Sequence, residues 1–433
     1  MQTSHVHASE QLLFFTLLQL LIIVLAGRLG GSAAQKLGQA RVVGEIVVGI
    51  LLGPSLFGLL APAAFGLVFR STPPLPLDLL SQVGLLLLMF QIGLEFEFSH
   101  LGERRNRRAV LGVALAGIAV PFVLGLGFAP LVPAAYAGPA SSAQSFALFF
   151  ATALSITALP VLGRLLMEFG LTRAPLGVIA ISAAAINDVA GWLCLALVTT
   201  LASAPFDGGR FGLRVAAVLA FAAVCWWGVR PLLARWVESR VERDGELSGQ
   251  VMGVVLAGIF AGGMATYELG IFAVFGGFML GVLLHDRARF AAAWKERVGR
   301  FVDVFFLPVF FAYTGLRTDI GSLADRAAWL WCAAVISIAT LGKFGGCYLA
   351  ARLAGLRRDE SRLLGAMMNT RGLMELVVLN VGYDLRVIGP QMFTMLVLMA
   401  IASTVATSPL LRRWLPALGL WQPTVRAARP ALR

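Results

Sequence analysis

The stretch that decides the fold is Leu176–Leu201, LGVIAISAAAINDVAGWLCLALVTTL. A run of about 20 apolar residues is enough for a helix to cross a bilayer. This run holds a single charged residue, Asp188, near its centre, with Asn187 beside it. A charge at that depth costs roughly 3 kcal/mol or more, so it is rare unless it faces a cavity or a partner. The segment therefore predicts a buried site for a proton or small cation; the alternative is a structural ion pair between helices.

The composition of the chain is typical of a polytopic helical membrane protein. Of its 433 residues 58% are hydrophobic and only 13% charged, whereas soluble domains carry about 25% charged residues. The formal net charge of +12 comes from basic residues in short loops between apolar segments, so it does not indicate nucleic-acid binding. The four cysteines lie in apolar segments without paired spacing, and the histidines form no cluster, so we expect no disulfide and no cofactor.

Hydropathy predicts thirteen membrane-spanning helices. They are expected near residues 11–30, 41–60, 79–97, 108–130, 145–168, 175–201, 211–236, 247–266, 268–285, 301–317, 327–352, 362–383 and 390–412. Most of the Lys and Arg residues fall in alternate loops, which the positive-inside rule places in the cytoplasm. The N-terminus is then outside and the C-terminus inside. The Ala- and Arg-rich composition and short tails favour a bacterial inner membrane.

An internal repeat appears when spans seven apart are compared. The third span ends in GLEFEF, residues 93–98, and the tenth in GLRTDI, residues 315–320. An odd offset means that the two copies enter the membrane from opposite sides. Inverted repeats of this kind are typical of secondary transporters, whose site lies at the midplane where discontinuous helices meet.

The fifth span contains a predicted break. Ser155 and Thr157 precede Pro160 in TALSITALPVLGRLL. Proline removes a backbone donor and clashes with the preceding turn, so the helix should loosen around Ile156–Thr157. Free carbonyls are tolerated at this depth only where they line a cavity or meet a ligand, and they are good ligands for an alkali cation. We therefore expect Ser155 and Thr157 to take part in ion binding, together with Asp188 and Asn187. A simple proline kink is the alternative reading.

Two further spans carry buried charges. In the twelfth, Arg371 and Glu375 are four residues apart and can pair on one helical face, while Gly372 would ease unwinding. A structural pair is the favoured interpretation of these two. In the eleventh, Lys343 can extend to the interface or reach Asp188 or the broken helices.

These residues resemble the monovalent cation/proton antiporter superfamily, in particular the branch with plant cation/proton exchangers and bacterial sodium or potassium/proton antiporters. The resemblance rests on ITALPVLGRLL, AISAAAINDVAGW, KFGG and MNTRGLMELVVLNVG, in this order along the chain. It implies an all-helical, inverted-repeat fold with crossed discontinuous helices, and a homodimer. It also implies a core, about 108–201 and 327–412, that moves like an elevator against dimerisation helices, about 11–97 and 247–317. The helix at about 211–236 would link them, and no soluble regulatory domain is expected.

The resemblance also implies roles for single residues. Asp188 matches the carboxylate that binds the proton and the metal cation, and Thr157 matches the broken-helix position that helps to hold the cation. Asn187 stands where electrogenic members carry a second Asp. Lys343 and Arg371 match basic residues of the core that accompany this pair and the crossed helices.

Together these features predict an antiporter, not an enzyme, that exchanges Na⁺ or K⁺ for H⁺. Burial favours the protonated form of Asp188 and a nearby cation favours the charged form, so proton and metal ion can compete for one site. One carboxylate predicts electroneutral one-for-one exchange. A sodium-coupled organic-anion symporter of similar fold is the main alternative. A channel and an intramembrane aspartyl protease are weaker ones, since the protease needs two carboxylates sharing a proton.

Overall fold

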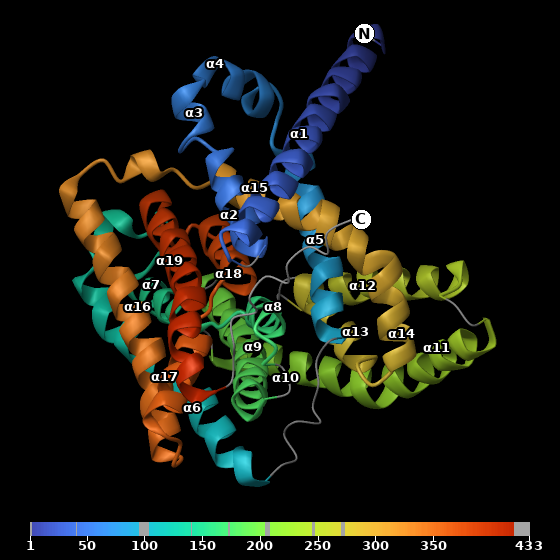
Figure 1. Cartoon of the computed structure of the whole chain (residues 1–433). Helices are drawn as coiled ribbons and strands as arrows, with labels where there is room; N and C mark the ends of the chain where they lie inside the picture. Colours follow the sequence, from blue (N-terminus) through green and yellow to red (C-terminus); the bar gives the residue numbers. More distant parts are fainter. Residues whose placement is uncertain are drawn as a thin grey trace, which may run out of the picture.

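The computed structural model describes residues 2–39, 41–94, 104–139, 141–171, 174–203, 208–244, 247–269 and 273–419 (Figure 1). Throughout these ranges the regular structure is helical and no β-strand occurs. The first half of the chain forms α1 Gln2–Lys36, α2 Arg41–Leu51, α3 Phe57–Leu60, α4 Pro62–Phe65, α5 Leu75–Leu94, α6 Arg104–Phe128, α7 Ala143–Ser155, α8 Leu159–Glu168 and α9 Pro175–Ser203. The second half forms α10 Gly208–Ala223, α11 Arg230–Asp244, α12 Gly249–Glu268, α13 Ala273–Leu283, α14 Ala288–Trp294, α15 Leu307–Leu316, α16 Arg326–Leu353, α17 Arg358–Met368, α18 Leu373–Asp384 and α19 Pro390–Trp414.

The apolar helices are long enough for a multi-pass membrane protein. Seven described helices are long and apolar enough to cross a membrane, and a bent pair around α14 and α15 makes an eighth. Other predicted spans correspond to short or interrupted helices, such as α7 and α13, which are apolar but too short to cross a membrane alone. The number of crossings, thirteen in the sequence analysis, therefore stays a prediction.

The helices pack in two groups. In one group α6, α7 and α9 pack against each other and against α16, α17, α18 and α19. In the other, α2 packs on α1 and α15, while α13 packs on α5 and α12. Figure 1 shows α6, α16 and α19 gathered on one side of the molecule and α12, α13 and α14 on the other. Contacts between the groups are fewer and include α2 with α19.

Glycines allow the closest approaches within the second group. A Cβ atom at Gly49 or at Gly315 would collide with the backbone of the facing helix, so α2 and α15 touch through these two residues. The same is true of Gly93 on α5 and Gly281 on α13. Small residues at such crossings let helix backbones pack without a layer of side chains between them.

Several predicted helix boundaries differ from those of the structure, and two of them lie near the first glycine contacts. The second predicted span, 41–60, is not one helix: α2 ends at Leu51, just before Gly53 and Pro54, and only the short α3 follows. A proline lacks the backbone N–H that would continue the helix. The third predicted span, 79–97, is helical from Leu75 to Leu94, and residues 95–97 lie outside the described part of the chain.

Candidate functional site

The predicted break in the fifth span is confirmed. α7 ends at Ser155, residues 156–158 are not helical, and α8 begins at Leu159. The cause is Pro160, which has no N–H to donate to the carbonyl four residues earlier, that of Ile156. The backbone N–H of Ala158 instead donates to the carbonyl of Thr370 at 3.2 Å. The break in this span thus pairs directly with the break in the twelfth.

The second break separates α17 from α18 at residues 369–372. Gly372 has φ +151°, a conformation that side-chain-bearing residues rarely adopt, so a glycine is needed here. Thr404 of α19 holds the open backbone: its Oγ1 accepts from Arg371 N at 3.0 Å and donates to Arg371 O at 2.5 Å. Sequence reasoning placed Arg371 on a helical face with Glu375; that placement is wrong, because Arg371 lies in the break itself.

Asp188 lies on α9 and is 1% exposed. Within the described part of the chain, no donor meets hydrogen-bond geometry with either of its carboxylate oxygens. Two groups act on it electrostatically, the backbone N–H of Leu159 at the start of α8 and the ammonium of Lys343. Burying an ionised carboxylate is very unfavourable unless it is paired or hydrogen-bonded.

Asn187 connects α9 to the first break. In the amide orientation that satisfies its neighbours, its Oδ1 accepts from Thr157 Oγ1 at 3.2 Å. Its Nδ2 then donates to the carbonyls of Ala114, at 2.9 Å, and Ala183, at 3.3 Å. Asn187 and Thr157 are fully buried. The pair therefore fixes the extended segment of the break next to Asp188.

Lys343 is fully buried on α16 and binds carbonyl groups. Its Nζ donates to Gly117 O of α6 at 2.7 Å and to Ser155 O at the end of α7. It forms no ion pair with Asp188 in the described structure, so the sequence-based suggestion of direct reach holds only as an electrostatic interaction. Ser155 contributes its carbonyl to Lys343, while its own hydroxyl donates to Ala151 O at 2.7 Å.

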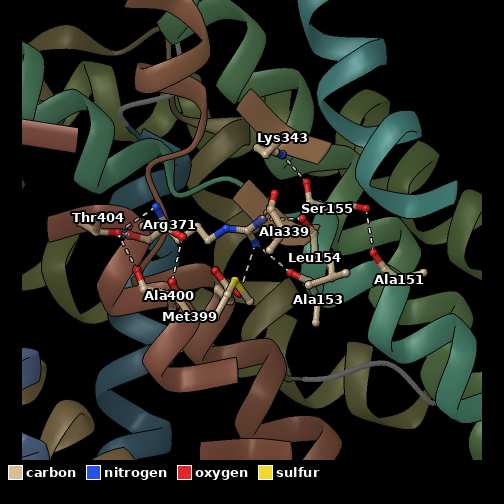
Figure 2. A network of polar contacts seen from close by, with 12 residues as sticks. Ala151, Ala153, Leu154, Ser155, Ala339, Lys343, Arg371, Met399, Ala400 and Thr404 are labelled. Carbon is tan, nitrogen blue, oxygen red and sulfur yellow. Dashed lines mark hydrogen bonds and ion pairs between the residues drawn. The ribbon is translucent and has the colours of Figure 1, made fainter. Parts of the chain in front are cut away.

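The predicted pair of Arg371 and Glu375 is confirmed, at 3.2 Å between two fully buried side chains. Figure 2 shows that the guanidinium also points at the end of α7. It donates to Ala153 O at 3.2 Å and Leu154 O at 2.7 Å. The last carbonyls of a helix have no intrahelical partner and carry partial negative charge. Arg371 and Lys343 together cap this end of α7.

Sequence reasoning missed two sets of residues. Thr404 has no distinguishing signal in the apolar run of α19, since only the fold brings it to the second break. The other set lies at the far end of α15 and α18, where Arg317 pairs with Asp384 at 2.7 Å. There Asn380 also donates to Thr314 Oγ1 at 2.8 Å. A polar cluster joining two helices could have been suspected from Asn380 alone, an amide inside an apolar span.

Comparisons with known proteins agree with this geometry. Residues 20–413 match the family model described as sodium/hydrogen exchanger, transmembrane. The chain is 36% identical over 406 residues to the Na(+)/H(+) antiporter NhaS4 of Synechocystis, covering 94% of this chain and 98% of that protein. It is 39% identical to cation/H(+) antiporter 17 of Arabidopsis thaliana over 93% of this chain and 48% of the relative.

Two more distant comparisons extend the picture. The K(+)/H(+) antiporter 1 of Saccharomyces cerevisiae is 31% identical over 94% of this chain, but the chain spans about half the length of that protein and of the plant relative, 47% and 48%. The solved structure of the sodium proton antiporter MjNhaP1 from Methanocaldococcus jannaschii superimposes with a TM-score of 0.63 at 15% identity, covering 95% of this chain and 99% of the neighbour. That likeness concerns the fold. The match to the family model over most of the chain, on helices that cross a membrane, shows that this chain belongs to the sodium/hydrogen exchanger family within the monovalent cation/proton antiporter superfamily.

Proposed function

We propose that this chain exchanges a monovalent cation, Na⁺ or K⁺, for H⁺, with Asp188 as the group that both ions share. The supporting observation is a fully buried carboxylate for which no described donor meets hydrogen-bond geometry, set beside two interrupted helices. Such a group needs a positive partner to stay at this depth. The relatives that match over most of this chain are named as sodium, potassium or cation/proton antiporters.

The cation ligands are expected to come from Asp188 and from the first break. Thr157 lies within hydrogen-bond distance of Asn187, the neighbour of Asp188. Backbone carbonyls and hydroxyls are the ligands that alkali cations meet in membrane proteins. Lys343 already binds Ser155 O, so we assign Ser155 to the support of the break and Thr157 to the cation. The charged side chains of Lys343, Arg371 and Glu375 hold the interrupted helices in position, and no cofactor is required.

One carboxylate gives one-for-one stoichiometry. Asn187 is uncharged, so the loaded site carries the same charge with a proton as with a sodium or potassium ion. Binding of one ion excludes the other, and alternating exposure of the site then gives obligatory exchange. We therefore propose electroneutral transport, which should not respond to an imposed membrane potential when the chemical gradients are equal.

Alternating exposure follows from an inverted repeat. In the proposed repeat α2 corresponds to α13 and α5 to α15, so the packing of α2 on α15 has its equivalent in α13 on α5. Likewise α6 on α9 has its equivalent in α16 on α19. This correspondence supports a core, about 108–201 and 327–412, moving as an elevator against dimerisation helices, about 11–97 and 247–317. The helix at about 211–236 would link the two parts. We propose that the protein is a homodimer in the bacterial inner membrane, with its N-terminus on the outside.

The first experiment measures proton movement in acid-loaded proteoliposomes after addition of Na⁺, K⁺ or Li⁺. Wild type is compared with Asp188→Asn and with Asp325→Asn, which removes an exposed carboxylate at the start of α16. We expect cation-driven exchange in wild type and Asp325→Asn, and none in Asp188→Asn. Undiminished exchange in Asp188→Asn would overturn the assignment of the site. A sodium-coupled organic-anion symporter finds no support among these antiporter relatives.

A further inference from the structure

A basic pocket lies at one end of α16, α17 and α19, and Asp188 is not among the residues that line it. It has a volume of about 570 Å³ and is lined by Phe344, Tyr348, Arg358, Arg362, Leu410, Arg413 and Trp414. The three helices pack against one another and lie side by side at one edge of the molecule (Figure 1). The pocket lies at the ends of these helices whose connecting loops are rich in arginine. The positive-inside rule predicts that this side is cytoplasmic.

The arginines of the pocket are poorly neutralised. Arg362 pairs with Asp359 at 3.2 Å. The side chains of Arg358 and Arg413 make no hydrogen bond or ion pair with another described residue, and the neighbouring Arg412 side chain turns away to Gly38 O at 2.9 Å. Guanidinium groups form planar forks that match the oxygens of a phosphate. The pocket thus presents an excess of positive charge shaped for a phosphate group.

The walls of the pocket are aromatic and adjoin the lipid-facing side of α16. Phe344 and Tyr348 stack with ring centroids 6.4 Å apart, and Phe344 also contacts Trp414. On the same helix Leu341 and Leu349 are 71% and 59% exposed, as expected of side chains that face lipid. Aromatic side chains concentrate at the level of lipid headgroups, and basic pockets between helices on the cytoplasmic side bind anionic headgroups.

We propose that this pocket binds a phosphate group, and its position beside lipid-facing leucines favours the headgroup of an anionic phospholipid. The arginines would hold the phosphate oxygens, and the rings would contact the glycerol and the first part of the acyl chains. All three helices belong to the proposed moving core, but binding at the pocket does not depend on transport. The proposal therefore stands or falls separately from the assignment of Asp188.

The test uses the full chain in detergent and titrates phosphatidylglycerol, phosphatidylcholine and inorganic phosphate, with bound lipid counted by native mass spectrometry. Arg358→Gln/Arg413→Gln removes two pocket charges. Arg235→Gln/Arg243→Gln removes two exposed charges from α11 and serves as the matched control. A lost charge-assisted hydrogen bond lowers affinity roughly tenfold. We expect phosphatidylglycerol to bind wild type and the control alike, and the pocket variant at least tenfold more weakly.

The other outcomes decide the source of the phosphate or reject the site. Inorganic phosphate that displaces phosphatidylglycerol from wild type, and fails to stabilise the pocket variant, would support the site with a soluble phosphate compound as its occupant. Equal binding by wild type and the pocket variant would overturn the proposal. So would an equal loss in both variants, because general surface charge would then explain the affinity. The double Lys variant, Arg358→Lys/Arg413→Lys, should keep part of the affinity, because lysine keeps the positive charge but lacks the planar pair of donors of a guanidinium.

Discussion

Arg371 is the residue that most connects the parts of the site. Its buried guanidinium neutralises Glu375 and binds the carbonyls of Ala153 and Leu154. Removing one member of a buried pair costs about 3–5 kcal/mol, so we expect that loss of unfolding free energy in Arg371→Met. Glu375→Met should cost less, because the guanidinium keeps its carbonyl partners. Thermal unfolding of both variants in detergent measures the order, and equal losses would argue against capping of α7 by Arg371.

Asn187 supplies two donors that a carboxylate lacks. Its amide nitrogen donates to Ala114 O and Ala183 O, so Asn187→Asp places an acceptor against two acceptors. We expect a lower melting temperature for this variant. The second carboxylate also allows a second proton for each cation, so transport should become sensitive to an imposed membrane potential. Proton flux in proteoliposomes with and without the potential tests this; a voltage-independent variant would show that Asp188 alone sets the stoichiometry.

The sequence indicates which charges are buried but not what they bind. The depth of Asp188, Lys343 and Arg371 follows from their positions in apolar spans. The fold decides that Lys343 binds Gly117 O and Ser155 O, because the helices α6, α7 and α16 meet there. Of these contacts, only the ion pair of Arg371 and Glu375 could be predicted from the sequence, because the two residues are four positions apart. Contacts between residues that lie 188 and 226 positions apart leave no trace in local spacing.

The two helix breaks have different causes. The first contains no positive φ and follows from Pro160. The second depends on Gly372, whose φ is +151° and whose added Cβ would lie 2.9 Å from Val161 Cγ2. The proline break was therefore predictable with its position. The glycine break was only suggested, because many glycines in membrane helices serve close packing, as Gly49 and Gly281 do.

Gly372→Ala tests the second break. Alanine cannot adopt this φ without strain, and such conformations cost about 1–3 kcal/mol. We expect a lower melting temperature and slower exchange. The control is Gly253→Ala in α12, where an added Cβ meets nothing within 4 Å. The unfolding free energy of Gly253→Ala should rise by up to about 1 kcal/mol, because alanine has the higher helix propensity. A Gly372→Ala variant as stable as Gly253→Ala would show that the backbone at the break can rearrange freely.

At the scale of the whole molecule, polar contacts between the two helix groups lie at both ends. At one end Arg317 and Thr314 of the α15 segment meet Asp384 and Asn380 of α18. At the other, Arg412 in the last turn of α19 donates to Gly38 O. Motion of the core against the other helices has to break at least one of these sets. The family resemblance predicted a core and a set of dimerisation helices, whereas these contacts depend on how the two helix groups face each other in one conformation.

A cross-link at the first end should therefore stop transport. We expect Arg317→Cys/Asp384→Cys, in a chain whose four natural cysteines are replaced by alanine, to exchange ions until a bifunctional thiol reagent joins the pair. A reductant that cleaves the reagent should restore exchange. The control, Ser55→Cys/Ile320→Cys, joins two segments of the same group, where Ile320 N donates to Ser55 Oγ at 3.0 Å. Its cross-linking should leave the rate unchanged. Full exchange by the cross-linked Arg317/Asp384 pair would mean that α15 and α18 do not separate during transport, which the elevator motion requires.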